Sequence, residues 1–305
     1  MWFKNIALFR FSEPFSLDEA GLEERLAAFC LRPCGSHEPF SLGWVAPLQS
    51  GAGQLVHTTS GFMMICCGKE EKVLPVAVVN EMLAKRAQEL EEQQARRLRR
   101  KERENLRDEI VFELLPKALS FSKRTYAYID TKGQWLVIDS GSSNSTDEFT
   151  GFLRKSLDSL PIAVPNTNER PASVMTRWLN DQRTPADITL EDECELHSTD
   201  HESNTVRCKR QDLFTDEIQV HLDAGKECIK LGLSWNDRLT FVLDESLNLK
   251  RLRFLDLIQN QAAESHTEDA ADIFDTEFSI MTLELANFIP RLLELFGGES
   301  TPSDR

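Results

Sequence analysis

The stretch that decides the fold runs from Pro75 to Pro116 and reads PVAVVNEMLAKRAQELEEQQARRLRRKERENLRDEIVFELLP. Proline is tolerated at the first position of a helix and ends one further along, and no residue between these two prolines breaks a helix. About 40 helical residues would extend roughly 60 Å, with a kink or a short break expected over such a length. Between Glu91 and Asn105 only Ala95 and Leu98 are apolar. Because a helix that is polar on all sides bridges solvent or projects from the body, the stretch predicts a projecting helical arm.

Outside the arm, strands and helices are mixed, which predicts an α+β fold with hairpin-plus-helix units. A hairpin over 54–67 precedes the arm. A second hairpin over 126–139 precedes a helix at 146–157, and a third over 228–243 precedes a helix that starts near Asn248.

The two ends of the chain complete this pattern. Apolar alternation predicts a strand at 2–11, and an apolar stripe predicts a helix at 17–29 with Ser16 as its N-cap, followed by a loop at 32–47. A long amphipathic helix with apolar residues from Ile273 to Leu293 ends at Gly297-Gly298. We divide the chain into an N-terminal part at 1–74, the arm and its tip at 75–124, a central part at 125–184, a C-terminal base at 185–298 and a tail at 299–305 that we expect to be disordered.

The charge of the chain is acidic overall but unevenly distributed. The 305 residues include 35 Lys and Arg against 50 Asp and Glu, for a net charge of -15 at pH 7. That balance alone argues against nucleic acid, because phosphate binding needs a basic surface. Yet one run within the arm has a local net charge of +5 even after Glu102 and Glu104 are subtracted. Its basic residues are Arg96, Arg97, Arg99, Arg100, Lys101, Arg103 and Arg107.

Two interpretations of this basic run are open. Arginine suits phosphate, because its planar guanidinium donates two hydrogen bonds to one anion. Alternatively, the run is a solvated helix face with ion pairs to Glu91, Glu92 and Glu104. The first is favoured because the charges lie where the helix has no apolar face for the core to use. The patch could be extended by Lys117, Lys123 and Arg124, and a second candidate cluster consists of Arg207, Lys209, Arg210 and Gln211.

Metal and enzyme motifs are weak or absent. The spacing of Cys194, His197, His201 and Cys208 could hold a tetrahedral zinc ion, but short zinc clips pair Cys with Cys and His with His. The segment is rich in acidic residues, so we interpret it as an acidic, mobile loop between two strands. No phosphate-binding glycine loop, zinc-protease motif or nucleophile elbow occurs, so we expect neither catalysis nor a cofactor.

Compartment signals are few. No run of roughly 18 apolar residues predicts a membrane-spanning helix, and the N-terminus lacks the basic region of a signal peptide. The 7 Cys are irregularly spaced, and without an export signal they indicate reduced thiols in a cytoplasm.

Short motifs spread in one order over residues 1–298 resemble those of a known family. They begin with Met1-Trp2-Phe3-Lys4-Asn5, Pro33-Cys34-Gly35-Ser36, Gly43-Trp44-Val45 and Lys69-Glu70-Glu71-Lys72-Val73-Leu74-Pro75. They continue with Leu153-Arg154-Lys155-Ser156-Leu157, Leu160-Pro161, Lys209-Arg210-Gln211-Asp212-Leu213, Ala224-Gly225-Lys226, Leu249-Lys250-Arg251-Leu252-Arg253-Phe254 and Met281-Thr282-Leu283-Glu284-Leu285. With this set the chain is similar to the bacterial recombination-associated protein RdgC family.

The resemblance implies a DNA-binding protein without catalysis, associated with the nucleoid in the cytoplasm. Family members look like horseshoe-shaped monomers that close head-to-head and tail-to-tail into a ring-shaped homodimer. Duplex DNA passes through the hole, and single strands are also expected to bind. By occupying DNA, the family members restrain the RecA-type recombinase. The DNA-contacting positions match Arg96 and its neighbours on the arm, and Arg210-Gln211.

The resemblance also implies an apolar contact at the tip of the arm, after Pro116. The matching position is Leu119, where the family leads us to expect an aromatic residue, and Phe121 lies two residues on. Either residue could fill the partner's pocket, and the ordinary alternative is that both pack under their own helix.

Two further hypotheses compete with a DNA clamp. In the first, the chain is a protein-interaction module whose arm docks an acidic partner, and DNA is irrelevant. In the second, it is a metalloenzyme built on the Cys194–Cys208 segment.

Overall fold

The computed structural model describes residues 1–48, 53–198, 204–255, 258 and 269–300. Its described strands form one 12-stranded antiparallel sheet in the order β2-β4-β5-β6-β1-β12-β11-β10-β8-β9, with β3 beside β4 and β7 beside β1. The first strands are β1 (Ile6–Phe11), β2 (Phe40–Val45), β3 (Val56–Thr59), β4 (Phe62–Lys72), β5 (Ser120–Asp130) and β6 (Trp135–Asp139). The others are β7 (Ile162–Ala163), β8 (Ile188–Ser198), β9 (Thr205–Lys209), β10 (Lys226–Trp235), β11 (Leu239–Asp244) and β12 (Leu249–Phe254).

The first strand of the chain lies in the middle of this sheet. Strand β1 pairs with β6 on one side, over the register from Ile6↔Asp139 to Arg10↔Trp135. On its other side Ile6 pairs with Leu249 of β12. Strand β1 therefore joins the N-terminal half of the sheet to the C-terminal half.

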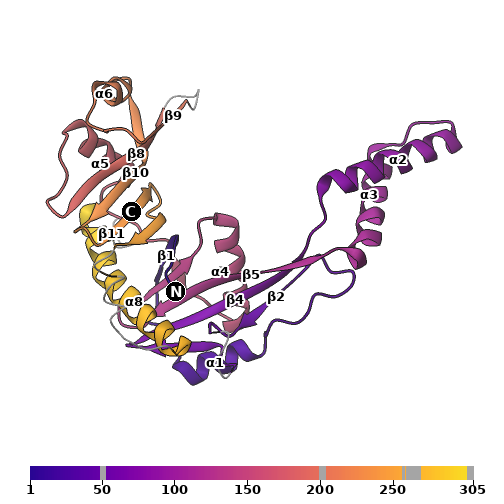
Figure 1. The fold of residues 1–305 in the computed structure, drawn as a ribbon, viewed down its shortest axis with the longest axis horizontal. Coiled ribbons are helices and arrows are strands. Elements are labelled where there is room, and N and C mark those ends of the chain that lie inside the picture. The colour runs from indigo at the N-terminus through magenta and orange to yellow at the C-terminus, as the bar shows by residue number, and fades with distance from the viewer. Residues whose placement is uncertain (49–52, 199–203, 256–257, 259–268, 301–305) are drawn as a thin grey trace.

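Helices cover the two faces of the sheet unequally. Because side chains alternate along a strand, Ile6 and Leu8 of β1 enter the core beneath helix α8 (Ala270–Leu295), while Ala7 enters a second core beneath α1 (Glu19–Ala27) and α4 (Ser143–Leu157). The first core also receives apolar residues of α5 (Pro171–Asn180) and α6 (Asp216–Asp223). Figure 1 shows α8 along one side of the sheet and α4 on the other.

The arm is a pair of helices rather than one. Helix α2 (Val76–Gln94) and helix α3 (Arg100–Leu114) run antiparallel, and a short 3-10 turn, η1 (Leu115–Lys117), leads into β5. A break was expected, but it is a full turn of the chain at Ala95, whose φ of 49 is left-handed, so the prediction that the stretch extends roughly 60 Å was wrong. The Ala95 N–H bonds back to the Glu91 and Glu92 carbonyls, which ends α2.

The two arm helices have their own small core, whose buried residues lie outside the stretch from Glu91 to Asn105, and no residue of that stretch is buried, in agreement with the prediction that the middle of the arm is polar. Val79 and Ala87 of α2 pack against Leu106 and Ile110 of α3, and Leu98 packs at the edge of this cluster. Each helix has a narrow apolar stripe, and the two stripes face each other. Because no other element contributes to this cluster, the arm is a separate packing unit that projects from the sheet (Figure 1).

Several local expectations change with the structure. Helix α1 is capped by Asp18, whose carboxylate accepts the Gly21 N–H, and not by Ser16. The expected loop at 32–47 contains strand β2, and the expected helix after Asn248 is strand β12. The helix near the C-terminus is confirmed as α8, with Gly297 and Gly298 at positive φ after it. In the expected tail, Glu299 pairs with Thr167, and residues 301–305 lie outside the described residues.

Candidate nucleic-acid interface

The basic run of the arm lies where α2 turns into α3. Arg96, Arg97 and Arg99 are in the connection, and Arg100, Lys101 and Arg103 are in the first turns of α3, with Arg107 one turn further on. All of these side chains are exposed. The turn places them at the far end of the arm, away from the sheet (Figure 1).

Three of these arginines are paired with carboxylates. Arg96 makes a two-pronged contact with Glu102, at 2.9 Å and 2.7 Å. Arg100 donates to Glu104 at 2.9 Å, and Arg103 lies 3.5 Å from Glu91. The hydrogen bonds from Arg96, with one from the Arg99 backbone N–H, lower the pKa of Glu102 to about 2. Glu102 also begins α3 by accepting that N–H, so this carboxylate serves the local fold.

The other four basic residues of the run have no such partner. Within the part of the chain that the structure describes, Arg97, Arg99, Lys101 and Arg107 form no ion pair within 4.0 Å. The arm therefore presents uncompensated positive charge at one place, although the chain has a net charge of -15. Free guanidinium groups at an exposed turn are suited to bind phosphate.

Lys117 ends η1, and Leu119 and Phe121 follow it. Lys117 is exposed, and Leu119 and Phe121 are 82% and 48% exposed, so neither packs under its own helix. Phe121 lies across from Glu71, which in turn pairs with Phe40 on the next strand, and Phe40 is 45% exposed. The Leu119 carbonyl accepts the Val73 N–H, so Leu119 and Phe121 lie at the base of the arm, and their expected place at its tip was wrong. Exposed apolar side chains thus gather at the junction of arm and sheet.

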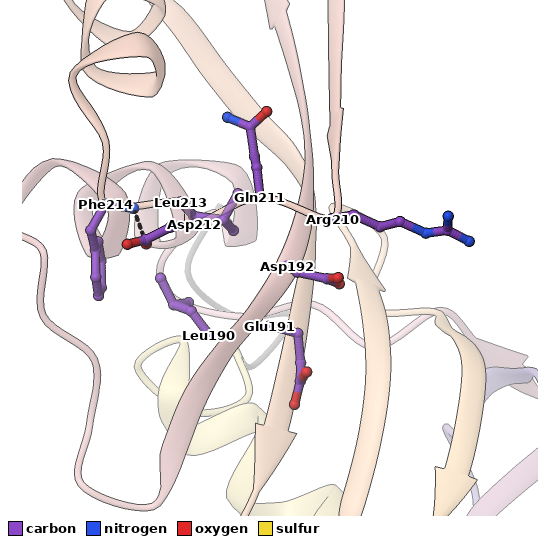
Figure 2. A pocket seen from close by; sticks show the side chains of 8 residues that line it. All are labelled: Leu190, Glu191, Asp192, Arg210, Gln211, Asp212, Leu213 and Phe214. Atoms are coloured by element: carbon purple, nitrogen blue, oxygen red, sulfur yellow. Dashed lines mark hydrogen bonds between the residues drawn. The ribbon is translucent and has the colours of Figure 1, made fainter.

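The second basic cluster lies at the end of β9. Lys209 is the last residue of that strand, across from Glu193, and Arg210 and Gln211 begin the loop to α6. Arg210 has a left-handed φ of 58, and the Gln211 N–H donates to the Asp192 carbonyl at 3.4 Å. Figure 2 shows the Arg210 side chain extending away from the loop. Arg207, by contrast, is paired with Glu195 at 3.2 Å.

Within a single chain, the structure does not bring these two basic clusters together. The arm and the β9 end lie at opposite ends of the molecule along its longest axis (Figure 1). Lys123 donates a hydrogen bond to Ser145, and Arg124 donates one to the Ala46 carbonyl. Both side chains are therefore bonded to the body of the protein and do not extend the basic run of the arm.

A third basic group was missed by sequence reasoning. Lys230, Lys250 and Arg251 line a shallow hollow of about 290 Å³ with Arg207 and Lys209, on adjacent strands of the C-terminal sheet. Carboxylates compensate most of this charge: Lys230 lies 2.9 Å from Glu195, Lys250 lies 3.1 Å from Asp244, and Arg251 pairs with Glu193. The available signal was the alternation of polar and core residues along these strands, which no single run of basic residues reveals.

The interpretation of the segment from Cys194 to Cys208 as an acidic, mobile loop needs correction. Cys194 and Cys208 are directly paired across β8 and β9, both are buried, and burial raises the pKa of Cys194 to about 12. The expected acidic, mobile loop is therefore mostly a strand pair. His197 lies on β8, and His201 lies outside the described residues. Among the residues that the structure describes, no group of three or more His, Cys, Asp or Glu could hold a metal ion.

None of the helices within the described ranges combines the length and the apolar character that crossing a bilayer requires.

Comparisons with known proteins cover nearly the whole chain. The family model described as "Putative exonuclease, RdgC" matches residues 1–299. A "Recombination-associated protein RdgC" from Aeromonas hydrophila is 43% identical over 299 residues, which is 98% of this chain and 99% of that protein. Proteins of the same name from Halorhodospira halophila and Yersinia pestis are each 41% identical, over 99% and 98% of this chain and 100% and 99% of their own length.

The printed names of these relatives refer to recombination and to no enzyme activity, whereas the family description mentions an exonuclease. A match of this length and identity agrees with the short family motifs, which occur in one order from Met1 to Leu285. The chain belongs to the RdgC family.

Proposed function

We propose that this protein is a sequence-independent DNA-binding protein that encircles duplex DNA as a ring-shaped homodimer. The observation that carries the proposal is the unpaired positive charge of Arg97, Arg99, Lys101 and Arg107 at the end of the arm, in a chain that is otherwise acidic. The recombination-associated name of the relatives supports a DNA substrate.

The candidate contacts are with phosphates rather than with bases. The DNA-binding residues that we assign are Arg96, Arg97, Arg99, Arg100, Lys101 and Arg103 on the arm, Lys117 at its base, and Lys209, Arg210 and Gln211 at the end of β9. Few aromatic side chains lie among those of the arm, and phosphate contacts carry no sequence information. Acidic residues on the other surfaces would repel DNA from them.

Ring closure would bring the two distant basic clusters onto one DNA molecule. The arm and the β9 end rise from the body toward the same side of the view in Figure 1, which fits a horseshoe whose open side a second copy closes. Leu119 and Phe121 are the candidates for one contact, and the C-terminal helices for the other. By occupying DNA near the nucleoid, such a ring would restrain the RecA-type recombinase.

A mobility shift with random duplexes at several salt concentrations tests the proposal. If about six phosphates are neutralised, log K should fall with log salt at a slope near -5. Changing Arg96, Arg97, Arg99 and Arg100 together to Glu should abolish binding and leave the melting temperature nearly unchanged, because these side chains are exposed. A flat salt response, or strong discrimination between unrelated duplexes, would refute it.

The same preparation tests for catalysis. The proposal has no chemical step, so end-labelled duplex and single strands incubated with Mg²⁺ or Mn²⁺ should stay at full length. Strand exchange by a RecA-type recombinase should slow in proportion to the DNA that is occupied. Shortening of the labelled ends that co-purifies with the protein and is lost in a matched variant would establish the exonuclease of the family description instead.

One observation favours a second candidate, a protein-interaction module. A hollow of about 440 Å³ on the arm is lined by Leu83 and Leu98, by Arg100, Arg103 and Arg107, and by one carboxylate, Glu104. An acidic peptide with an apolar side chain would fit this arrangement. Tight binding of such a peptide with no measurable binding of DNA would favour this candidate over the clamp.

A further inference from the structure

A hollow of about 440 Å³ lies beside the second basic cluster, between β8 and the loop that joins β9 to α6 (Figure 2). Its apolar lining comes from Leu190, Leu213 and Phe214. Its polar lining includes Gln211 and the carboxylates of Glu191 and Asp192. The DNA-contacting role assigned above to Arg210 and Gln211 does not use this apolar surface.

The loop that forms the hollow is held by several local bonds. The Asp212 carboxylate accepts the Phe214 N–H at 2.9 Å, and the Thr215 hydroxyl donates to the Asp212 carbonyl at 3.3 Å. Leu213 is only 3% exposed and anchors the loop in the core. Next to this anchor, the Phe214 ring stays 39% exposed. The hydrogen-bonded turn therefore holds the aromatic ring of Phe214 at the surface of the hollow.

The polar side chains beside the hollow have unused hydrogen-bonding capacity. Within the described part of the chain, neither the Arg210 guanidinium nor the Gln211 carboxamide makes a hydrogen bond or an ion pair. Arg210 holds a left-handed φ of 58, a conformation that costs energy in a residue other than glycine. Figure 2 shows these two side chains pointing in different directions from the loop, with Phe214 on its other side.

This combination suits an unstacked nucleobase. Aromatic rings bind bases of single strands by stacking, and unpaired guanidinium and carboxamide N–H groups can donate to the phosphates of the same strand. The carboxylates of Glu191 and Asp192 oppose a phosphate inside the hollow but can accept the amino N–H groups of a base. A stacked base pair of a duplex does not expose the face that Phe214 would contact.

We propose that the hollow receives one nucleobase of a single strand, which stacks on Phe214, while Arg210 and Gln211, further along the same loop, contact the backbone of the same strand (Figure 2). The inference rests on the proposed function as a DNA-binding protein and adds to it a site for single strands only. Duplex DNA would use the phosphate contacts alone.

The test compares Phe214→Ala with Val220→Ala, a matched change of an exposed apolar residue on α6 that does not line the hollow. Fluorescence anisotropy measures binding of a single strand and of a duplex of the same length, and quenching of 2-aminopurine in the single strand reports stacking. Phe214→Ala should weaken single-strand binding about tenfold and abolish the quenching. Its duplex affinity should stay within about twofold of wild type, and Val220→Ala should change neither.

Unchanged single-strand binding and quenching in Phe214→Ala would overturn the inference. So would an equal loss for single strand and duplex in a variant with native melting, because the hollow would then serve both forms. If Phe214→Ala melts early, Phe214→Leu keeps the apolar volume and should still lose the quenching. Free deoxyadenosine monophosphate that binds as tightly as the strand would indicate a nucleotide site and overturn the strand assignment. If wild type binds single strands but no duplex, the clamp fails and the hollow stands.

Discussion

At the scale of single residues, the basic run of the arm contains two kinds of arginine. Arg96, Arg100 and Arg103 face carboxylates, whereas Arg97 and Arg99 do not. The Arg100–Glu104 pair is an i,i+4 contact that the sequence indicates, whereas the pairs Arg96–Glu102 and Arg103–Glu91 depend on the turn at Ala95, which the sequence does not reveal. The acidic residues of the arm therefore reduce the charge that the arm can offer to DNA.

Replacing Glu102 with glutamine should strengthen DNA binding. The change removes one negative charge and frees Arg96, while the glutamine amide oxygen can still accept the Arg99 N–H that begins α3. We expect duplex affinity to rise several-fold and the salt slope to steepen by about one, measured by anisotropy at two salt concentrations. The control is Glu24→Gln, which makes the same change of charge at an exposed residue of α1. Equal effects of both changes would mean that net charge, and not the arm, sets the affinity.

Buried thiols should make the fold sensitive to alkali. Burial raises the pKa of Cys66 and of Cys67 from 9.0 to about 12. The folded protein therefore keeps these protons while the unfolded chain loses them, so the free energy of unfolding falls as pH rises from about 9 toward 12.

The measurement is urea unfolding of wild type, Cys66→Ala and Cys30→Ala at pH 8 and pH 10. Removing the Cys66 thiol should reduce the loss of stability between the two pH values by about 1 kcal/mol. Cys30 is exposed, and its removal should leave the loss as in wild type. The burial argument fails if Cys66→Ala loses as much stability as wild type does.

At the scale of elements, the arm should unfold independently of the sheet. Its core consists of residues from α2 and α3 alone, including the fully buried Ile110. Ile110→Ala should destabilise the arm by about 2–4 kcal/mol through the cavity that it leaves. Hydrogen exchange should speed up in residues 76–114 and stay unchanged in β1 and β6, and faster exchange in the sheet would show that arm and body are coupled.

Hydrophobic patterns predicted most of the elements but not their partners. The hairpins β3–β4, β5–β6 and β10–β11 and helix α8 follow from alternation, turn residues and apolar stripes that lie within the elements themselves. The turn within the arm was not predicted because the apolar stripes of Val79–Ala87 and Leu106–Ile110 are each short. Their packing against each other is visible only in the tertiary structure. The strand after Asn248 was missed because its place beside β1 depends on residues about 240 positions away.

The candidate site was predictable to a similar degree. The run from Arg96 to Arg107 is visible in the sequence because its charges are contiguous. The hollow at Phe214 was not, since its walls come from β8 and from the loop after β9, and neither part shows a pattern by itself. Lys230 and Lys250 were missed for the same reason.

At the scale of the whole molecule, the proposed ring depends on two separate contacts. Leu119 and Phe121 are exposed at the base of the arm and fit one of them. Changing both to Asp would place charge in an apolar pocket of the partner and cost several kcal/mol at that contact. The double variant should remain a dimer through the other contact but lose its hold on closed circular DNA.

Size-exclusion chromatography with light scattering checks the first outcome, and retention of relaxed circles at high salt checks the second. Val164→Asp, at another exposed apolar residue, is the control and should hold circles like wild type. A fully monomeric double variant would contradict the two-contact arrangement. Retention equal to that of wild type would show that Leu119 and Phe121 do not close the ring.

The central place of β1 has a consequence for biosynthesis. Ile6 is among the first residues to leave the ribosome, whereas its neighbour Leu249 is made only after four-fifths of the chain. Until then the edge of β1 that faces β12 is covered only at Arg10 and Phe11, by the two residues of β7, and an unpaired strand edge promotes association between nascent chains. The sheet that carries the arm at one end and Arg210 at the other can be completed only after Phe254, the last residue of β12, has been made.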